Sequence, residues 1–214
     1  MTAGARRAQV LAVAQDLFSR EGYHHVSMDD IADRAAVSKP VLYRHFPSKL
    51  DLYLAVIDHR GAALVAAVDD ALAAVTPASE AASGPVRAEV PPGREVVRAI
   101  VRAYMEFVET AGESSTLLFE SDVTRDADVR SRVEHASEAT AAAIRDALRE
   151  LAGLGDAEAA LVGSSLVGMA RVAATQRYRA GDVTVAAAVD LLTRLAWRGV
   201  AGLITTEQER HATG

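Results

Sequence analysis

The sequence predicts an all-α protein of about nine helices. Of its 214 residues 44 are alanine, and only 5% are aromatic, which biases the chain toward strong helix formers. Every periodic segment places apolar residues at the spacing of a helix, and none shows the alternation of a strand. A chain of 22.6 kDa can bury a sizeable core, in one domain of ordinary size or two small ones.

The first two helices have clear start and stop signals. Apolar residues at helical spacing predict a helix over Ala3–Glu21, and Gly22 stands where a C-terminal cap belongs. Ser27 followed by Asp30 resembles a capping box, and it begins a short second helix that ends near Ala36.

A third short helix begins after Ser38, which we expect to cap it. Pro40 falls in its first turn, where a missing amide hydrogen costs nothing, and Leu42 and Phe46 form its inner face. The next proline stops this helix, and Ser48 then caps a longer fourth one.

Residues 76–93 hold four of the six prolines and almost no periodic apolar residues, which predicts a flexible linker. Helical patterns resume beyond this linker. They cover Arg94–Thr110, a short Ser115–Ser121, Ala127–Leu151, Ala157–Tyr178 and Val185–Ile204.

Composition excludes several functions. The chain has no cysteine, which excludes disulfide scaffolds, cysteine-based zinc sites and thiolate nucleophiles. The longest uncharged stretch, Ala159–Ala170, is too short to cross a bilayer, and the first residues lack the apolar segment of a secretory signal. We therefore expect a soluble, cytoplasmic protein with no membrane partner and no metal or cofactor.

Charge is distributed unevenly along the chain. The net charge is −6, yet residues 1–60 hold eight basic and seven acidic side chains, whereas the rest hold fifteen and twenty-two. Arg34, Lys39, Arg44 and Lys49 recur at five-residue intervals, which indicates a local basic patch of the kind that binds nucleic acid. On charge alone, a solvated helix surface is the commoner explanation.

The two short helices and the tight turn between them suit DNA reading, because the major groove admits one α-helix. The third helix presents Lys39 and Arg44 as donors to guanine or phosphate, and Val41 as a contact for a thymine methyl. Lys49 begins the next helix, where backbone amides favour a phosphate. Taken singly, each residue is equally explained as an exposed side chain. The candidate DNA-binding residues are Ser27, Ser38, Lys39, Pro40, Val41, Tyr43, Arg44, His45 and Lys49.

The stretch from Val26 to Tyr53 resembles the helix-turn-helix signature of the TetR family of transcriptional regulators. It contains, in order, an opening serine, an isoleucine-alanine pair, the turn Ala-Ala-Val-Ser, and the motifs Leu-Tyr-Arg-His-Phe and Ser-Lys. The resemblance implies a DNA-binding domain at 1–50 and a ligand-binding and dimerisation domain at 51–214.

Two positions depart from the family pattern. The family usually has glycine where this chain has Ala36, and a left-handed backbone there would cost alanine about 1 kcal/mol. The family also often has glycine where Pro40 stands. Proline in the first turn keeps the fold but changes what touches DNA, so base preferences cannot be transferred from relatives.

The resemblance further implies an effector pocket among the later helices and a homodimer formed by the last two. Small residues between Ala157 and Tyr178 permit close helix approach, although a monomer core would also use them. An apolar set with few polar interruptions suits a small apolar effector, and each member is also explained as core. The candidate ligand-binding residues are Tyr104, Phe107, Val108, Leu118, Phe119, Val123, Ile144, Leu148, Leu166, Met169 and Gln176.

Residues 37–58 and 117–126 are similar to an actinobacterial subgroup that includes regulators of fatty-acid synthesis genes responding to long acyl-CoA. This similarity implies a long-chain acyl-CoA as the effector.

The sequence therefore predicts a homodimeric repressor that binds double-stranded operator DNA and is released when an apolar effector binds the arrangement unsuited to DNA. The alternative is a helical protein-interaction module that keeps the helix-turn-helix fold without specific DNA binding. An enzyme is not expected, because the GxSxG, P-loop, HExxH and GxGxxG motifs are absent.

Overall fold

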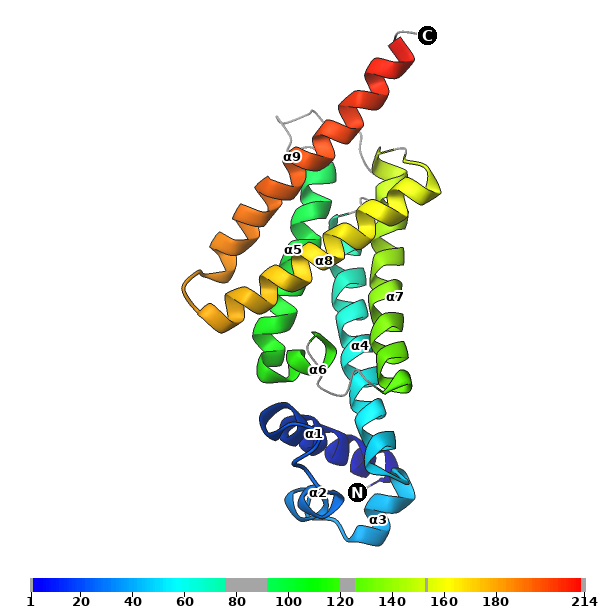
Figure 1. Cartoon of the computed structure of the whole chain (residues 1–214), viewed down its shortest axis with the longest axis vertical. Helices are drawn as coiled ribbons and strands as arrows, with labels where there is room; N and C mark the ends of the chain where they lie inside the picture. Colours follow the sequence, from blue (N-terminus) through cyan, green and yellow to red (C-terminus); the bar gives the residue numbers. More distant parts are fainter. Residues whose placement is uncertain (1, 76–91, 120–125, 153, 213–214) are drawn as a thin grey trace. The chain divides into compact units, whose positions relative to one another are not determined.

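The computed structural model describes residues 2–75, 92–119, 126–152 and 154–212, and these ranges contain helices and short turns only (Figure 1). The predicted all-α class is thus confirmed. In chain order, the helices of the described residues are α1 (Ala3–Glu21), α2 (Met28–Arg34), α3 (Lys39–His45), α4 (Lys49–Val75), α5 (Pro92–Ala111), the 3-10 helix η1 (Gly112–Ser115), α6 (Thr116–Phe119), α7 (Ala127–Ala152), α8 (Asp156–Ala180) and α9 (Val185–Ala212). The expected short helix at 115–121 is instead η1 followed by α6, and α9 continues past the expected end at residue 204.

The predicted linker 76–93 lies mostly outside the described residues, but Pro92 and Gly93 belong to α5. Proline is favourable at the first position of a helix, because the amide hydrogen it lacks would have no partner there. Gly93 lies under the indole of Trp197, where an added Cβ would come within 2.9 Å of the ring. Helix α5 therefore begins two residues earlier than the sequence predicts.

The chain forms two compact units, and the first comprises residues 1–63 and 111–137. It holds α1, α2, α3, the start of α4, η1, α6 and the start of α7 (Figure 1). Its buried apolar side chains include Val10, Ala14, Phe18, Ile31, Leu42 and Phe46. Helix α1 contacts η1 and α6, and Gln15 Nε2 donates a hydrogen bond to Ser114 Oγ at 3.3 Å. The unit that contains α1 to α3 therefore extends beyond the expected boundary at residue 50.

Local hydrogen bonds start and end the first helices at the expected residues. Helix α1 ends at Gly22, whose φ of 80° favours glycine. Ser27 and Asp30 form the expected capping box at the start of α2. Hydrogen bonds from the Ser27 hydroxyl and then its backbone N–H lower the pKa of the exposed Asp30 carboxyl. The Asp30 pKa is lower in the folded than in the unfolded state. The capping box therefore stabilises the fold at neutral pH, and this stabilisation is lost as the pH falls through the folded-state pKa of Asp30.

The start of α3 differs from the expectation. Ser38 occupies the N-cap position, but its hydroxyl accepts no capping hydrogen bond. Pro40 has no amide hydrogen to donate, and the Val41 N–H bonds to the Ser38 carbonyl oxygen at 3.0 Å. The Ser38 hydroxyl is therefore left on an exposed surface. By contrast, the Ser48 hydroxyl accepts from the Asp51 N–H at 3.0 Å and caps α4 as expected.

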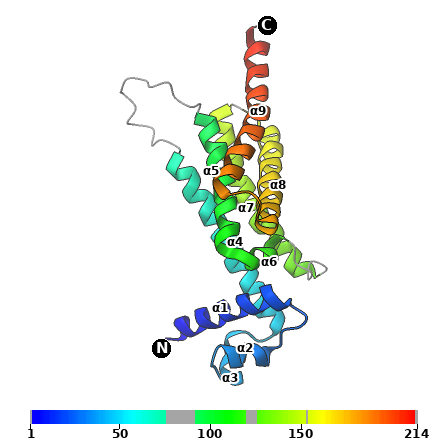
Figure 2. The same cartoon turned by 90° about the vertical axis from the view of Figure 1, so that its left-hand side faces the viewer.

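The second unit comprises residues 64–110 and 138–214, with the end of α4, α5, the rest of α7, α8 and α9. Gly163 allows α8 to approach the α7 backbone, because an added Cβ would lie 3.2 Å from the Ala141 carbonyl oxygen. Helices α8 and α9 contact one another and are joined by a turn that begins at Gly181, whose φ is 71° (Figure 2). They form a helical hairpin.

One helix of the described residues, α8, is long and apolar enough to cross a membrane on length and composition alone. A core helix of a water-soluble protein passes the same test, so the finding is weak evidence for a membrane span. The sequence estimate differed because it counted only the uncharged stretch.

The turn between α2 and α3 holds the one non-glycine residue with positive φ in the described part of the chain, Ala36 at 51°. We expect Ala36→Gly to raise the free energy of unfolding by about 1 kcal/mol, because glycine adopts this conformation without the Cβ clash. Urea unfolding at fixed protein concentration measures the change as a shifted midpoint with an unchanged slope. Ala35→Gly is the control, since Ala35 is buried with φ at −79° and should lose stability. Equal losses of stability in Ala36→Gly and Ala35→Gly would contradict backbone strain at Ala36.

Candidate nucleic-acid interface

Helix α3 has one buried face and one exposed face. Leu42 is completely buried, and Phe46, directly after the helix, is 2% exposed. Lys39, Pro40, Tyr43 and Arg44 are exposed, and Tyr43 retains 46% of its surface. A tyrosine here offers a hydroxyl donor and a ring to a partner surface. The exposed face of α3 is therefore the candidate interface.

Three further candidates line a hollow of about 340 Å³ beside this face. They are Ser38, Val41 and His45. The hollow is also lined by the start of α1, which brings Arg6 close to α3. Sequence reasoning missed Arg6 because more than thirty residues separate it from α3, and only the packing of the helices brings the two together.

Two of the candidates use their polar groups in hydrogen bonds to other residues of the same chain. The Ser27 hydroxyl accepts from the Asp30 N–H and donates to the Asp30 carboxylate at 2.6 Å. Lys49 Nζ donates to the carbonyl oxygens of Tyr23 and Val26, both at 2.9 Å, and lies 4.3 Å from the centre of the Tyr23 ring. Lys49 thus holds the loop before α2, which is a structural task that its position in the motif did not reveal.

Lys39 also has a partner. Its Nζ donates to Asp29 Oδ2 at 2.7 Å, and both side chains are more than half exposed. This hydrogen bond raises the pKa of the Lys39 ammonium, with smaller contributions from the charges of Asp29 and Asp33. Lys39 is therefore charged over the whole physiological range, and a carboxylate of α2 lies beside it on the candidate interface.

The candidate ligand-binding residues are divided between the two units. Leu118 and Phe119 belong to the first unit, on α6, and Val123 lies outside the described residues. Gln176 is exposed on α8, and Met169 is half-buried. The remaining members are buried in the second unit, namely Tyr104, Phe107, Val108, Ile144, Leu148 and Leu166. They form part of the core in this structure.

Tyr104 is the largest polar member of that buried set. It is 1% exposed, and burial raises the pKa of its hydroxyl to about 12, opposed by a hydrogen bond with Thr140 and the charge of Arg171. Tyr104 therefore stays protonated at neutral pH and brings a hydrogen-bonding group into an apolar region.

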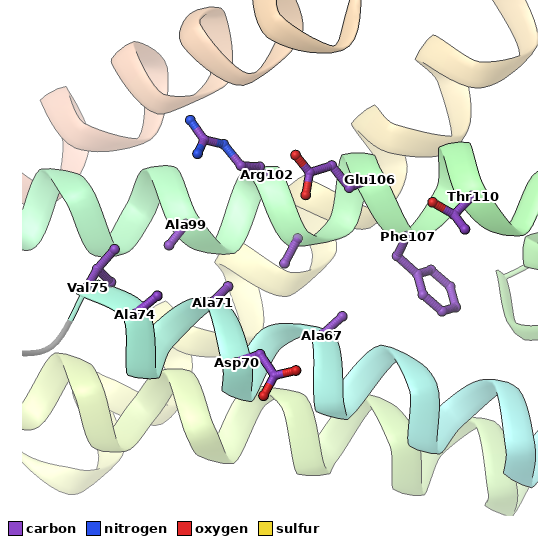
Figure 3. Close-up of a pocket in the computed structure, with 11 residues that line it drawn as sticks. Ala67, Asp70, Ala71, Ala74, Val75, Ala99, Arg102, Glu106, Phe107 and Thr110 are labelled. Carbon is purple, nitrogen blue, oxygen red and sulfur yellow. The ribbon is translucent and has the colours of Figure 1, made fainter.

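A groove of about 550 Å³ runs between α4 and α5 in the second unit (Figure 3). Alanines of both helices, Ala67 and Ala99 among them, form much of its lining, and Phe107 lies at one end. The charged residues Asp70, Arg102 and Glu106 also line it. Of the candidate ligand-binding residues that the structure describes, only Phe107 lines this α4–α5 groove. Small side chains at facing positions leave the space open, which sequence spacing alone does not reveal.

Comparison with known proteins supports the helix-turn-helix interpretation. Residues 10–56 match the family described as bacterial regulatory proteins, tetR family. The transcriptional activator FasR of Mycolicibacterium smegmatis is 35% identical over 197 residues, which cover 91% of this chain and 83% of FasR. The transcriptional regulator RutR of Escherichia coli is 43% identical over 53 residues, a quarter of each chain.

Solved structures share the fold over nearly the whole chain. A TetR-like transcriptional regulator from Rhodococcus sp. RHA1 has a TM-score of 0.66 at 31% identity, and the match covers 94% of this chain and 99% of that one. The regulator FadR of Bacillus subtilis, solved in complex with stearoyl-CoA, has a TM-score of 0.66 at 11% identity over 88% of this chain and 96% of that one.

Proposed function

Because the chain belongs to the TetR family of bacterial transcriptional regulators, we propose that α3 is its recognition helix and that a small apolar effector controls its affinity for operator DNA. The exposed face of α3 carries this proposal. Its cations and the Tyr43 hydroxyl are donors suited to phosphates and guanine edges, and its buried face packs within the first unit, where α3 contacts α2.

We propose that α8 and α9 form a homodimer interface. Large apolar side chains lie exposed on both helices, with Leu161 at 70%, Leu191 at 56% and Leu195 at 63%. Leu191 and Leu195 are four residues apart and so share one face of α9. Burying such a face against a second copy is the favourable alternative to exposing it. A dimer also presents two recognition helices to two half-sites about 34 Å apart.

The effector proposed is a long-chain acyl-CoA bound in the second unit. A pocket of several hundred cubic ångströms with apolar walls and a few charged groups suits such a ligand, and the α4–α5 groove has these properties. Arg102 offers a cation for the phosphates of the CoA moiety. Tyr104 and its buried neighbours are the side chains that an acyl chain would displace or contact.

The effector acts by linkage. It binds preferentially to the dimer arrangement that cannot place both recognition helices on one duplex, and operator binding weakens by the same factor. Helices α4 and α7 each belong in part to both units, and we propose α4, which continues from the helix-turn-helix, as the route by which the change passes. The proposed effect on transcription is repression, in the cytoplasm. FasR is named an activator, so a reporter-gene assay must distinguish repression from activation.

We expect Tyr43→Ala to lower affinity for operator DNA about tenfold with little change in the free energy of unfolding, because in the proposed complex the hydroxyl donates to a phosphate and the side chain is 46% exposed. The probe is the duplex that the wild-type protein selects from a random library, and gel shift at several salt concentrations measures binding. Lys49→Ala should instead lower stability by about 1–2 kcal/mol, because it removes the hydrogen bonds to Tyr23 and Val26. Selection of no sequence by the wild type would favour the protein-interaction alternative.

Leu195→Glu should convert the dimer to monomers, because a charge would be buried in the interface. Analytical ultracentrifugation measures the mass, and circular dichroism checks the helix content. Val183→Glu is the matched control, since Val183 is also exposed but lies in the turn between α8 and α9. A Leu195→Glu protein that remains dimeric places the interface elsewhere.

Native mass spectrometry should detect one added stearoyl-CoA per chain, and the same ligand should release operator DNA in the gel shift. Arg102→Ala should weaken stearoyl-CoA more than stearate, because only the former carries phosphates for the guanidinium. Equal losses for both ligands would remove Arg102 from the site, and retained operator binding with ligand bound would contradict the linkage.

A further inference from the structure

The Asp29–Lys39 pair lies where the candidate interface meets α2. Asp29 is in the first turn of α2 and Lys39 is the first residue of α3, and the two side chains are 55% and 58% exposed. An ion pair this exposed adds little to stability, because water screens it and two long side chains lose freedom. The helix dipole favours a carboxylate in the first turn of α2, but it does not account for the pairing of this carboxylate with Lys39.

Phosphates repel a carboxylate on a DNA-binding surface, and a hydrogen bond accepted from a base offsets this repulsion. The major groove offers two such donors, the amino groups of cytosine and adenine. Lys39 beside it is a donor, and guanine presents two adjacent acceptors, O6 and N7, for a lysine ammonium. The two side chains thus match the two bases of one G·C pair.

The two side chains can keep their mutual hydrogen bond and still contact one base pair. Lys39 Nζ donates to Asp29 Oδ2 at 2.7 Å. The ammonium has two further hydrogens for guanine O6 and N7, and the carboxylate has a second oxygen that can accept from cytosine N4. Thymine offers a lysine one acceptor in place of two, and its methyl group would face the charged pair.

We propose that Asp29 and Lys39 act as one recognition unit for a single G·C base pair in each half-site, with Asp29 as a specificity-determining residue that accepts from cytosine N4 while Lys39 donates to guanine. The inference rests on the DNA-binding function proposed above. Asp29 lies outside the helix that sequence analysis assigned to base reading, and the turn at Ala36 places it beside Lys39.

The pair also orients Lys39. A free lysine side chain samples many rotamers and loses that freedom on binding. The hydrogen bond to Asp29 holds the ammonium near one position before DNA arrives, and the charge of Asp33 adds a weaker attraction in the same direction. Preorganised contacts bind more specifically, because less freedom is lost when they form.

The test is selection from a random duplex library by the full-length wild-type protein, followed by binding measurements on single-base variants of the selected duplex. The variants are Asp29→Ala, Lys39→Met and the matched control Asp33→Ala, which removes the same charge from the same helix without the hydrogen bond. Wild type and Asp33→Ala should prefer G·C over A·T at one position of each half-site by at least fivefold. Asp29→Ala and Lys39→Met should lose that preference and keep the others.

A modified base isolates the carboxylate contact. N4-methylcytosine at that position replaces the groove-facing amino hydrogen, so it should weaken wild-type binding at least fivefold and leave Asp29→Ala binding unchanged. An unaltered G·C preference in Asp29→Ala, an equal loss at every position, or a preference for A·T would overturn the proposal while leaving DNA binding intact. A wild-type protein that selects no sequence overturns the proposed function itself, and this inference with it.

Discussion

The orientation of α3 depends on the burial of Leu42 and Phe46. The helix has seven residues, so two apolar anchors one turn apart determine which side chains face outward. Burying each contributes about 1.5–3 kcal/mol, more than any exposed charge on the helix can offset. Arg7 packs its guanidinium 4.9 Å from the centre of the Phe46 ring, so the core that holds α3 also engages a cation of α1.

Two lysines of the basic patch, Lys39 and Lys49, have hydrogen-bond partners within the protein that their spacing in the sequence does not predict. Lys49 directs its ammonium to two carbonyl oxygens, and Lys39 is paired with Asp29. Arg6 of α1 lines the hollow beside α3 and adds a cation to this surface. The electrostatic attraction for phosphate therefore comes from several elements of the first unit, and the evenly spaced cations of the sequence have different tasks.

Small side chains shape the second unit. Alanines at facing positions of α4 and α5 leave a groove, and glycine allows α8 to approach α7 closely. Large leucines on α8 and α9 are exposed, and burying them requires a second surface. Small side chains therefore shape the packing within the chain, whereas exposed leucines carry the proposed packing between chains.

The sequence by itself determined the helices and their caps, because apolar spacing, Gly22 and the Ser27–Asp30 box act within a few residues of one another. It also predicted which face of α3 is exposed, since Leu42 and Phe46 carry that information locally. Tertiary structure decided the rest. Asp29 beside Lys39, Arg6 beside α3 and the carbonyl partners of Lys49 depend on how helices pack across ten or more residues. The placement of Leu118 and Phe119 with α1 has the same origin, because hydrophobic burial is non-directional and an apolar residue does not encode its neighbour.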